Sequence, residues 1–351
     1  MNVGIAMLTL VPGLSGGSET YARALTAMLA REGRNSYSVL APTIAPDAGG
    51  GLPTVVAASY RASSGTPGRI AAMAATTLRP GELRRELDQA DVVHYPLTIP
   101  LPQSRRPTVV TLLDVQHLDL PGLFTRSERA FRRLAYDRAA RRADHVIVIS
   151  EWVRERAVER LGLDPRRVHA IHLGVDRGVF TPDDTVAREP FLLYPARPWA
   201  HKNHGRLLEA FSLVRQKRPE LRLVLTGVGH EPTTQVGVEI RGSVSRDELV
   251  DLYRRAAALV FPSLYEGFGL PPVEAMACGC PVAASSSGSL PEICGDAAVL
   301  FDPTAPEAIA SGIETALSRA PELAGLGLAR AANFTWEATA RRHDDVYDAM
   351  R

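Results

Sequence analysis

The segment "ALVFPSLYEGFGLPPVEAMACGCPVAAS", residues 258–285, places a loop rich in glycine and proline between two apolar runs. The runs "ALVFPS" and "CPVAAS" have the continuous apolar character of buried parallel strands. Two prolines fix the start of a short helix between them, and Gly279 follows its end. The segment therefore predicts a strand, a loop, a helix and a strand, with Glu266 in the loop and Glu274 in the first turns of the helix.

Similar apolar runs alternate with amphipathic stretches along the whole chain. The helical stretches include Ser18 to Glu32, Ser127 to Arg142 and a last helix within 334–351. The expected strands lie in "NVGIAML", "SYSVLAP", "ADVVHYP", "PTVVTLL" and "ADHVIVIS", and then in "PFLLYPA", "LRLVLTG", "VEIRGSV", "ALVFPS", "CPVAAS" and "AAVLFDP". These two series predict an α/β protein with two Rossmann-like, doubly wound parallel sheets and a domain boundary within 174–190.

The composition is that of an ordinary soluble enzyme, with 351 residues, 45% hydrophobic and 23% charged. A formal charge of +1 provides no general field for binding nucleic acid. Cys278, Cys280 and Cys294 lack the spacing of zinc ligands, so we expect reduced thiols in a cytoplasmic protein, the first two as small core residues. No segment is as long as a membrane span, and the N-terminus has the pattern of a first strand rather than of a signal peptide.

Two cations follow the strand "PFLLYPA". Ligands of open α/β sheets bind at the carboxyl ends of the strands, so two such sheets predict a site in a cleft between domains. Arg197 and Lys202 lie at such an end, before a helix that starts near Asn203. Two cations beside a helix N-terminus suit a diphosphate, whereas the alternative is a pair of solvated surface charges.

Glycines also follow the first strand, in "PGLSGGSETYA". Gly16 and Gly17 would let the backbone at the helix start approach phosphate oxygens. The alternative is a tight turn with Ser18 as the helix N-cap. The spacing is not GxGxxG, which argues against a nicotinamide dinucleotide.

The carboxylates of Glu266 and Glu274 are candidates for binding a ligand. Each carboxylate can accept hydrogen bonds from a hydroxylated ligand ring, while the N–H groups between them face negative charge. The alternative is one helix-capping carboxylate and one exposed carboxylate.

The segment "EGFGLPPVEAMACGCPVAAS" resembles the EX7E motif of the retaining glycosyltransferases of family 4, which have the GT-B fold. The resemblance extends to "PGLSGGSETYA", "VIVISEWVRERAVERLG", "GVDRGVFTP", "ARPWAHKNHGRLLEAF", "GSVSRDELVDLYRRA" and "GSLPEICGDAAVLFDP". It implies an acceptor-binding domain at 1–178, joined by a final helix at about 335–351, and a nucleotide-sugar-binding domain at 179–334.

The resemblance also implies roles for individual residues. Glu274 would bind the ribose hydroxyls of the donor and Glu266 a hydroxyl of the donor sugar. Arg197 and Lys202 would neutralise the diphosphate. The other implied donor contacts are Gly16, Gly17, Gly242, Val244, Gly267, Phe268, Gly269 and Leu270.

The strand "PTVVTLLDVQH" departs from the family pattern. Many relatives carry a histidine, often followed by aspartate, where this chain has Leu113 before Asp114. We expect His117 to take the catalytic role of that histidine or to bind the acceptor, with a structural histidine as the alternative. Asp114 is a second acceptor candidate, and a structural turn residue is the alternative for it.

The resemblance implies hexose transfer with retention of configuration, without a metal or a cofactor, to a hydroxylated acceptor in bacterial glycan, glycolipid or secondary-metabolite synthesis. GDP-mannose is slightly favoured over a UDP-sugar as the donor. The alternatives are a silent nucleotide-sugar-binding protein and a GT-B epimerase. The arginine-rich stretch from Arg126 to Arg142 predicts either a basic face for a lipid-linked acceptor or anionic membrane, or a merely solvated helix.

Overall fold

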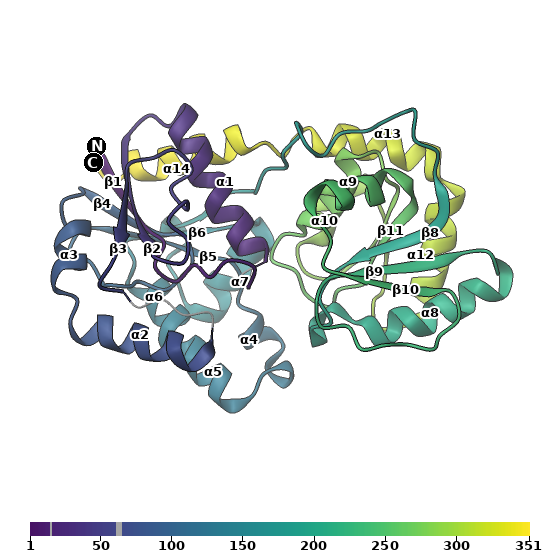
Figure 1. Cartoon of the computed structure of the whole chain (residues 1–351), viewed down its shortest axis with the longest axis horizontal. Helices are drawn as coiled ribbons and strands as arrows, with labels where there is room; N and C mark the ends of the chain where they lie inside the picture. The colour runs from purple at the N-terminus through teal and green to yellow at the C-terminus, as the bar shows by residue number, and fades with distance from the viewer. Residues whose placement is uncertain (15, 61–64) are drawn as a thin grey trace. The chain divides into compact units, whose positions relative to one another are not determined.

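The computed structural model describes residues 1–14, 16–60 and 65–351. The chain forms two compact units, Met1–Gly174 with Trp336–Arg351, and Val175–Thr335 (Figure 1). The division after Gly174 lies at the start of the segment 174–190 in which we expect the boundary. Each unit contains one parallel sheet with helices around it, so the α/β class with two Rossmann-like sheets is confirmed.

The first unit is built on a seven-stranded sheet in the order β3-β2-β1-β4-β5-β6-β7. Its strands are β1 (Asn2–Ala6), β2 (Ser36–Pro42), β3 (Thr54–Ala57), β4 (Val92–Tyr95), β5 (Thr108–Leu112), β6 (His145–Val148) and β7 (Val168–Ala170). Its helices are α1 (Gly17–Glu32), α2 (Thr66–Leu78), α3 (Gly81–Leu87), α4 (Gln116–Asp119), α5 (Arg126–Arg132), α6 (Arg138–Arg142), α7 (Glu151–Leu161) and α14 (Trp336–Asp348).

All five strands expected in this half are present, and the two edge strands β3 and β7 were not expected. β3 has only four residues, and Val55 and Val56 in it are exposed, so it lacks the continuous apolar run of a central strand. β7 has only three residues. The five central strands contribute buried residues such as Tyr95 and Val110 to the core, which helices complete from both faces.

The second unit is built on a six-stranded parallel sheet in the order β10-β9-β8-β11-β12-β13. Its strands are β8 (Glu189–Pro195), β9 (Arg222–Thr226), β10 (Val238–Gly242), β11 (Ala256–Phe261), β12 (Val282–Ser285) and β13 (Val299–Phe301). Its helices are α8 (His204–Lys217), α9 (Arg246–Arg255), α10 (Leu270–Ala277), α11 (Leu290–Cys294), α12 (Pro306–Ser318) and α13 (Ala320–Ala331). All six expected strands are present.

The strand order of the second sheet reverses direction between β8 and β11. This reversal is a topological switch point, where the loops after the two central strands diverge and leave room for a ligand. The cysteines of this unit are unpaired and buried, as expected for small core residues. Burial raises the pKa of Cys280 to about 11, so its thiol stays protonated and unreactive at neutral pH.

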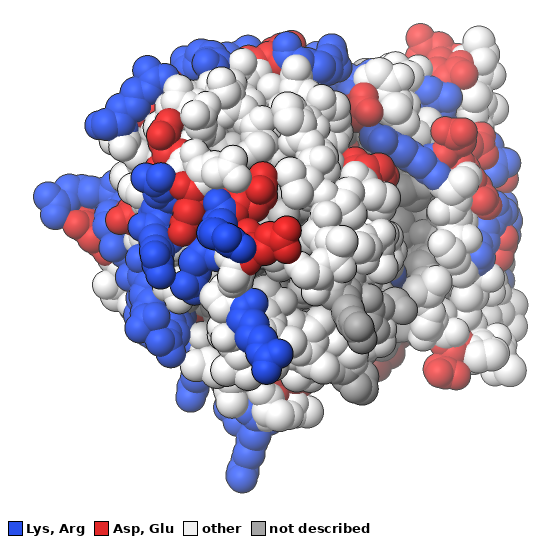
Figure 2. Space-filling model, turned by 60° about the vertical axis from the view of Figure 1, so that its left-hand side comes forward, with Lys and Arg blue, Asp and Glu red and all other residues white. Residues whose placement is uncertain are grey.

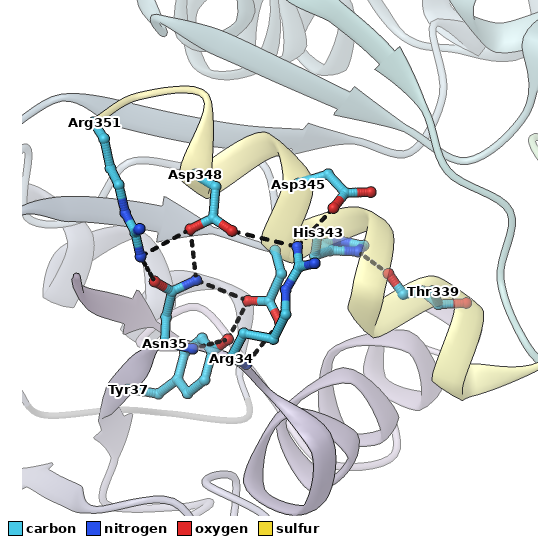
Figure 3. A network of polar contacts seen from close by, with 9 residues as sticks. Arg34, Asn35, Tyr37, Thr339, His343, Asp345, Asp348 and Arg351 are labelled. Atoms are coloured by element: carbon cyan, nitrogen blue, oxygen red, sulfur yellow. Dashed lines mark hydrogen bonds and ion pairs between the residues drawn. The ribbon is translucent and has the colours of Figure 1, made fainter.

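The last helix, α14, packs along α1 in the first unit (Figure 1). The buried carboxylate of Asp344 accepts hydrogen bonds from the Tyr37 hydroxyl, the Arg34 backbone N–H at 2.9 Å and the Asn35 amide at 3.1 Å. Arg34 also forms an ion pair with Asp345 at 2.6 Å (Figure 3). These contacts attach the end of the chain to the segment that begins β2.

A second set of buried side chains connects α14 to β4, β5 and α1. The set forms one continuous series of hydrogen bonds, each 2.8 Å long. The series runs through the Tyr347 hydroxyl, His94, the Thr111 hydroxyl, the Tyr21 hydroxyl, His343 and the Thr339 carbonyl. We call these six residues the α14 hydrogen-bond chain.

The last acceptor of the α14 hydrogen-bond chain determines which atom donates and which accepts in each of its hydrogen bonds. The Thr339 carbonyl can only accept, so His343 donates from Nδ1 and its Nε2 accepts from Tyr21. Burial lowers the pKa of His343 to about 4 and the pKa of His94 well below its usual range, so both rings are neutral at pH 7. The hydrogen bonds then all point one way, from Tyr347 to His94, Thr111, Tyr21 and His343. Each buried polar group of the α14 hydrogen-bond chain thus has a hydrogen-bond partner within the protein.

Candidate functional site

The residues that the sequence singled out in the second unit follow the two strands at its switch point. Arg197 and Lys202 come after β8, while Glu266 and Glu274 come after β11. Because β8 and β11 are paired in parallel, both loops leave the same edge of the sheet. The fold therefore places four residues from separate parts of the sequence after strands that end at one edge of the sheet, where Lys202 and Glu266 are in direct contact.

Lys202 is held in place by its neighbour Asn203, the N-cap of α8. The Asn203 side chain is buried and donates to the carbonyls of Pro262 at 3.0 Å and Pro303 at 2.8 Å. The Tyr194 hydroxyl donates to the Lys202 carbonyl at 2.6 Å. The loop after β8 is thereby fixed to the loops after β11 and β13, and the expected start of a helix near Asn203 is confirmed.

The ammonium group of Lys202 forms an ion pair with Glu266, with Nζ 2.5 Å from Oε1. Both side chains retain only 13% of their exposed surface. The pair is therefore largely shielded from water, which strengthens the attraction between the two charges. A diphosphate at this position would find a lysine that is already oriented by a carboxylate.

The loop between the two glutamates needs glycine at Gly269. Its φ of +105° is in the left-handed region, and a Cβ there would lie 2.7 Å from a side-chain carbon of Leu290. The buried Ser289 hydroxyl donates to the carbonyls of Glu266 at 3.1 Å and Phe268 at 2.8 Å, which fixes the loop from the other side.

The helix α10 starts at Leu270 with prolines at its next two positions. Proline has no backbone N–H, so the amide donors at this helix start come from the loop and from Leu270. Gly267 and Leu270 are partly exposed, whereas the Phe268 ring is buried and packs edge-on against Phe334 at 5.6 Å. Phe268 thus anchors the loop by its side chain, and any contact of its own with a ligand would be through backbone.

Glu274 lies in the first turns of α10, as expected, and its side chain remains partly exposed. Its Oε2 accepts a hydrogen bond from the Tyr253 hydroxyl at 3.0 Å. The surrounding protein desolvates the carboxylate and raises its pKa to about 7, while Tyr253 and the charge of Arg246 act in the opposite direction. A raised pKa in a strand-end site is typical of a functional carboxylate.

The remaining predicted donor contacts of the second unit lie around the same edge. Arg197 is half-buried after β8, with its guanidinium 5.8 Å from the centre of the exposed Trp199 ring. Gly242 ends β10 with a φ of +63°, and Val244 follows it with part of its surface exposed.

Gly16 and Gly17 lie at the start of α1 in the first unit. Gly16 is the N-cap of this helix and has a φ of +52°, so the alternative of Ser18 as N-cap is wrong. Gly16 has no side chain with which to cap the helix, and Glu19 accepts a hydrogen bond from the Gly13 N–H at 2.8 Å. Ser15, in the same motif, lies outside the described residues.

His117 lies in α4 with a fully buried side chain, and its Nε2 is 2.8 Å from a carboxylate oxygen of Asp137. Asp137 is itself buried, at the end of a π-helical turn between α5 and α6. The His117 side chain is thus buried against protein, as a structural histidine would be, but its Nδ1 has no hydrogen-bond partner among the described residues. Its predicted contact with the sugar or the acceptor gains no support from this geometry.

Asp114 keeps a partly exposed side chain after β5. One carboxylate oxygen accepts from the Gln116 N–H at 3.0 Å and lies 3.3 Å from the Arg132 guanidinium. These contacts are those of a turn residue, but the exposed surface also leaves room for an acceptor hydroxyl. Among the described residues, no cluster of three His, Cys, Asp or Glu side chains is arranged to hold a metal ion.

Two residues of the site were missed by sequence reasoning. Tyr253 was expected only as part of a helix, and Ser289 was given no role. The signal for Tyr253 is its place on the apolar face of "DELVDLYRRA", where a hydroxyl needs a buried partner. The serine has no comparable signal, because its two acceptors are carbonyls of a loop far away in sequence.

Two family models match the two halves of the chain. Residues 15–178 match the model described as Glycosyltransferase Family 4, and residues 182–327 match Glycosyl transferases group 1. Together they cover most of both units, including Arg197, Lys202, Glu266 and Glu274. The chain belongs to the family 4, group 1 glycosyltransferases.

Curated relatives of this glycosyltransferase include O-antigen chain mannosyltransferase B of Escherichia coli, 27% identical over 71% of this chain and 72% of the relative. The MMP alpha-(1->4)-mannosyltransferase of Mycolicibacterium hassiacum is 30% identical over 60% of this chain and 55% of the relative. A D-inositol 3-phosphate glycosyltransferase of Segniliparus rotundus is 32% identical over 50% and 46%. The matched region is about half the length of the latter two relatives.

Solved structures share the fold of this glycosyltransferase. Sucrose-phosphate synthase from Thermosynechococcus elongatus has a TM-score of 0.78 at 20% identity, over 100% of this chain and 99% of that one. Anabaena HepE, solved in complex with UDP and glucose, has a TM-score of 0.74 at 18% identity, over 99% and 100%. At these identities the likeness shows a GT-B fold.

Proposed function

We propose that this chain transfers a hexose from a nucleoside-diphosphate sugar to a hydroxyl acceptor, with retention of configuration and without a metal. The observation that carries the proposal is the grouping of Lys202, Glu266 and Glu274 at the switch point of the second sheet. This grouping offers a cation for the diphosphate and separate carboxylates for the donor sugar and for the ribose.

The chemistry explains why cations matter most in this proposal. Departure of the nucleoside diphosphate leaves positive charge on the sugar and negative charge on the β-phosphate. Arg197, Lys202 and the N–H groups of the loop at 267–270 would stabilise that negative charge. Glu266 would hold a sugar hydroxyl and Glu274 the ribose. Gly16 and Gly17, in the first unit, remain predicted contacts of the diphosphate.

Retention and the acceptor complete the proposal. The leaving phosphate would take the proton of the attacking hydroxyl on the same face of the sugar, so no protein nucleophile is required. Asp114 remains a candidate for the acceptor, and His117 is left out because its side chain is buried. The mannosyltransferases among the relatives support GDP-mannose as the first donor to test.

A thermal-shift series with GDP-, UDP-, ADP- and dTDP-sugars tests the donor class. A ligand present at 100 times its Kd adds about 2.7 kcal/mol of stability, so the correct donor should produce a clear shift. Proton NMR of the product then reads its anomeric configuration, and product of the same configuration as the donor is expected. Tight binding of a donor without turnover on any acceptor would favour a silent binding protein, and conversion of the nucleotide sugar to its epimer would favour an epimerase.

The first unit also supports a proposed peripheral contact with an anionic, lipid-linked acceptor or membrane. Arginine side chains gather on the face of this unit seen in Figure 2. In the stretch from Arg126 to Arg142, the large apolar side chains of Phe131 and Leu134 are exposed beside the arginines. No helix in the described part of the chain is long and apolar enough to span a membrane.

Flotation with liposomes tests this contact. The protein should float with vesicles that contain anionic lipid and not with neutral vesicles, and Leu134→Asp should reduce flotation. Equal behaviour with both kinds of vesicle would show a merely solvated helix.

A further inference from the structure

Tyr253 is a fully buried tyrosine whose hydroxyl is directed at a single group, the carboxylate of Glu274. The tyrosine lies on α9 and the glutamate on α10, two helices that pack against each other. Phe180 packs against the Tyr253 ring in a T-shaped contact at 6.1 Å. A buried tyrosine hydroxyl needs a partner, and here the partner is a residue with a proposed binding role.

The contact restricts how the Glu274 side chain can point. Tyr253 is packed on its ring faces and fixed at its hydroxyl, so it cannot follow a moving carboxylate. Oε2 accepts from this hydroxyl at 3.0 Å, and Oε1 accepts no hydrogen bond from the described residues of its unit. The carboxylate is thus held by one oxygen and presents the other, together with the remaining lone pair of the first, to a ligand.

Charged and titratable groups around Glu274 come from both packed helices. Tyr253 and Arg246 lie on α9, and Cys278 follows the end of α10. Arg246 is itself bound to Asp176 at 3.1 Å and lies over the Phe180 ring, so the neutral hydroxyl of Tyr253 makes the direct contact. A hydrogen bond to the ionised carboxylate stabilises the charged form that binds hydroxyls best.

We propose that Tyr253 is a positioning residue that orients and keeps ionised the carboxylate of Glu274 for the vicinal ribose hydroxyls of the donor nucleotide. This inference rests on the proposed function, which assigns the ribose to Glu274. It also explains how the Glu274 carboxylate could bind a diol where it is largely desolvated, because the neutral Tyr253 hydroxyl already donates one hydrogen bond to it.

Calorimetric titration of the full-length protein with nucleotides tests the inference. The probes are GDP and UDP, each compared with its 2′,3′-dideoxy form, between pH 6 and 9. Tyr253→Phe should weaken binding of the ribonucleotide by about fivefold to tenfold, the usual worth of one such hydrogen bond. It should leave binding of the dideoxynucleotide unchanged, because that ligand has no hydroxyls for Glu274.

The pH profile separates positioning from a purely structural effect. Binding of the ribonucleotide to the wild-type protein should weaken as the pH falls through about 7, as Glu274 becomes protonated. In Tyr253→Phe the midpoint should move to higher pH, because a contact that favours the carboxylate is gone. Glu274→Gln keeps the shape of the side chain and should remove the pH dependence.

Two different failures can be told apart. An equal loss for both forms of the nucleotide in Tyr253→Phe, or no loss for either, overturns the positioning role while the donor assignment stands. If Glu274→Gln leaves the preference for the ribonucleotide intact, or if none of GDP, UDP, ADP and dTDP binds the wild-type protein, the proposed function fails and the inference fails with it.

Discussion

Each unit of the molecule contains a cluster of buried titratable groups, and the two clusters differ in how their hydrogen bonds are satisfied. In the α14 hydrogen-bond chain of the first unit, every polar group has a protein partner. In the second unit, Glu274 has one protein hydrogen bond and remains partly exposed. The first arrangement is complete without a ligand, whereas the second leaves a desolvated carboxylate that a ligand can complete.

Desolvation shifts the pKa values of the two clusters in opposite directions. It lowers the pKa of His343 to about 4 and raises the pKa of Glu274 to about 7, because it disfavours the charged form in each case. Both groups are therefore driven toward neutrality, but only the histidine is neutral across the physiological range. The comparison teaches that a desolvated carboxylate indicates a ligand site when it lies at a strand end, stays partly exposed and has one oxygen that accepts no hydrogen bond from the described residues.

The largest expected effect is in the second unit, among the residues of the proposed donor site. Arg197→Ala should lower kcat by about a hundredfold to a thousandfold, because charge on the departing diphosphate would lose a cation. Steady-state kinetics at saturating donor measures it. The matched control is Arg222→Ala, at the amino end of β9, where the guanidinium pairs with Glu189 and Glu239. Equal losses in both variants would show a general effect of removing an arginine.

The next effect separates binding from chemistry within the same cluster. Glu274→Ala should raise the donor KM about tenfold to a hundredfold with a smaller change in kcat, since the ribose is remote from the reacting carbon. Kinetics at limiting and saturating donor distinguish the two parameters. A loss confined to kcat would place Glu274 at the reacting end of the donor and contradict the assignment.

A smaller effect is expected in the α14 hydrogen-bond chain of the first unit. Tyr21→Phe removes one hydroxyl from the middle of the α14 hydrogen-bond chain and leaves Thr111 and His343 each short of a buried partner, at a cost of about 1–3 kcal/mol. Hydrogen exchange of peptides from α14 should become faster, while peptides of the second unit keep their wild-type rates. Unchanged protection of α14 would show that the chain of hydrogen bonds does not hold this helix.

The smallest effect tests the sign of the Glu274 shift. The folded protein holds the Glu274 proton more tightly than the unfolded chain, so ionisation costs stability as the pH rises from about 4.5 to about 7. Glu274→Gln should therefore raise Tm by a few degrees at pH 8 and leave it unchanged at pH 4. His343 acts in the opposite direction, since its stabilising neutral form is lost as the pH falls from 6.5 toward 4. A gain for Glu274→Gln that is the same at both pH values would contradict the raised pKa.

The sequence predicted the parts of this account that depend on local pattern. Central strands have continuous apolar runs, and the segment from Glu266 to Glu274 has glycines and prolines at positions that only one local conformation satisfies. The short edge strand β3, with exposed Val55 and Val56, has no such pattern. The edge strands β10 and β13 of the second sheet could be found from their apolar residues, whereas the short edge strands β3 and β7 of the first sheet could not.

Tertiary contacts account for the remaining differences. His117 was expected near a ligand, but a π-helical turn after α5 brings Asp137 against it in the interior. The Ser18 alternative failed because the N-cap of α1 lies two residues earlier, at Gly16, which has a positive φ. The spacing of residue types indicates neither the contact between His117 and Asp137 nor the N-cap at Gly16, since each depends on how a distant or flanking segment packs.

The most direct test of the central claim is release of nucleoside diphosphate from a donor sugar by two lysine variants. Lys202 is paired with Glu266 at the switch point, just before helix α8, and Lys217 is exposed at the last residue of that helix. With GDP-mannose or whichever nucleotide sugar stabilises the protein, Lys202→Ala should lose at least about tenfold in rate, and Lys217→Ala should match the wild type. Equal rates in the two variants would contradict a donor site at the carboxyl ends of β8 and β11.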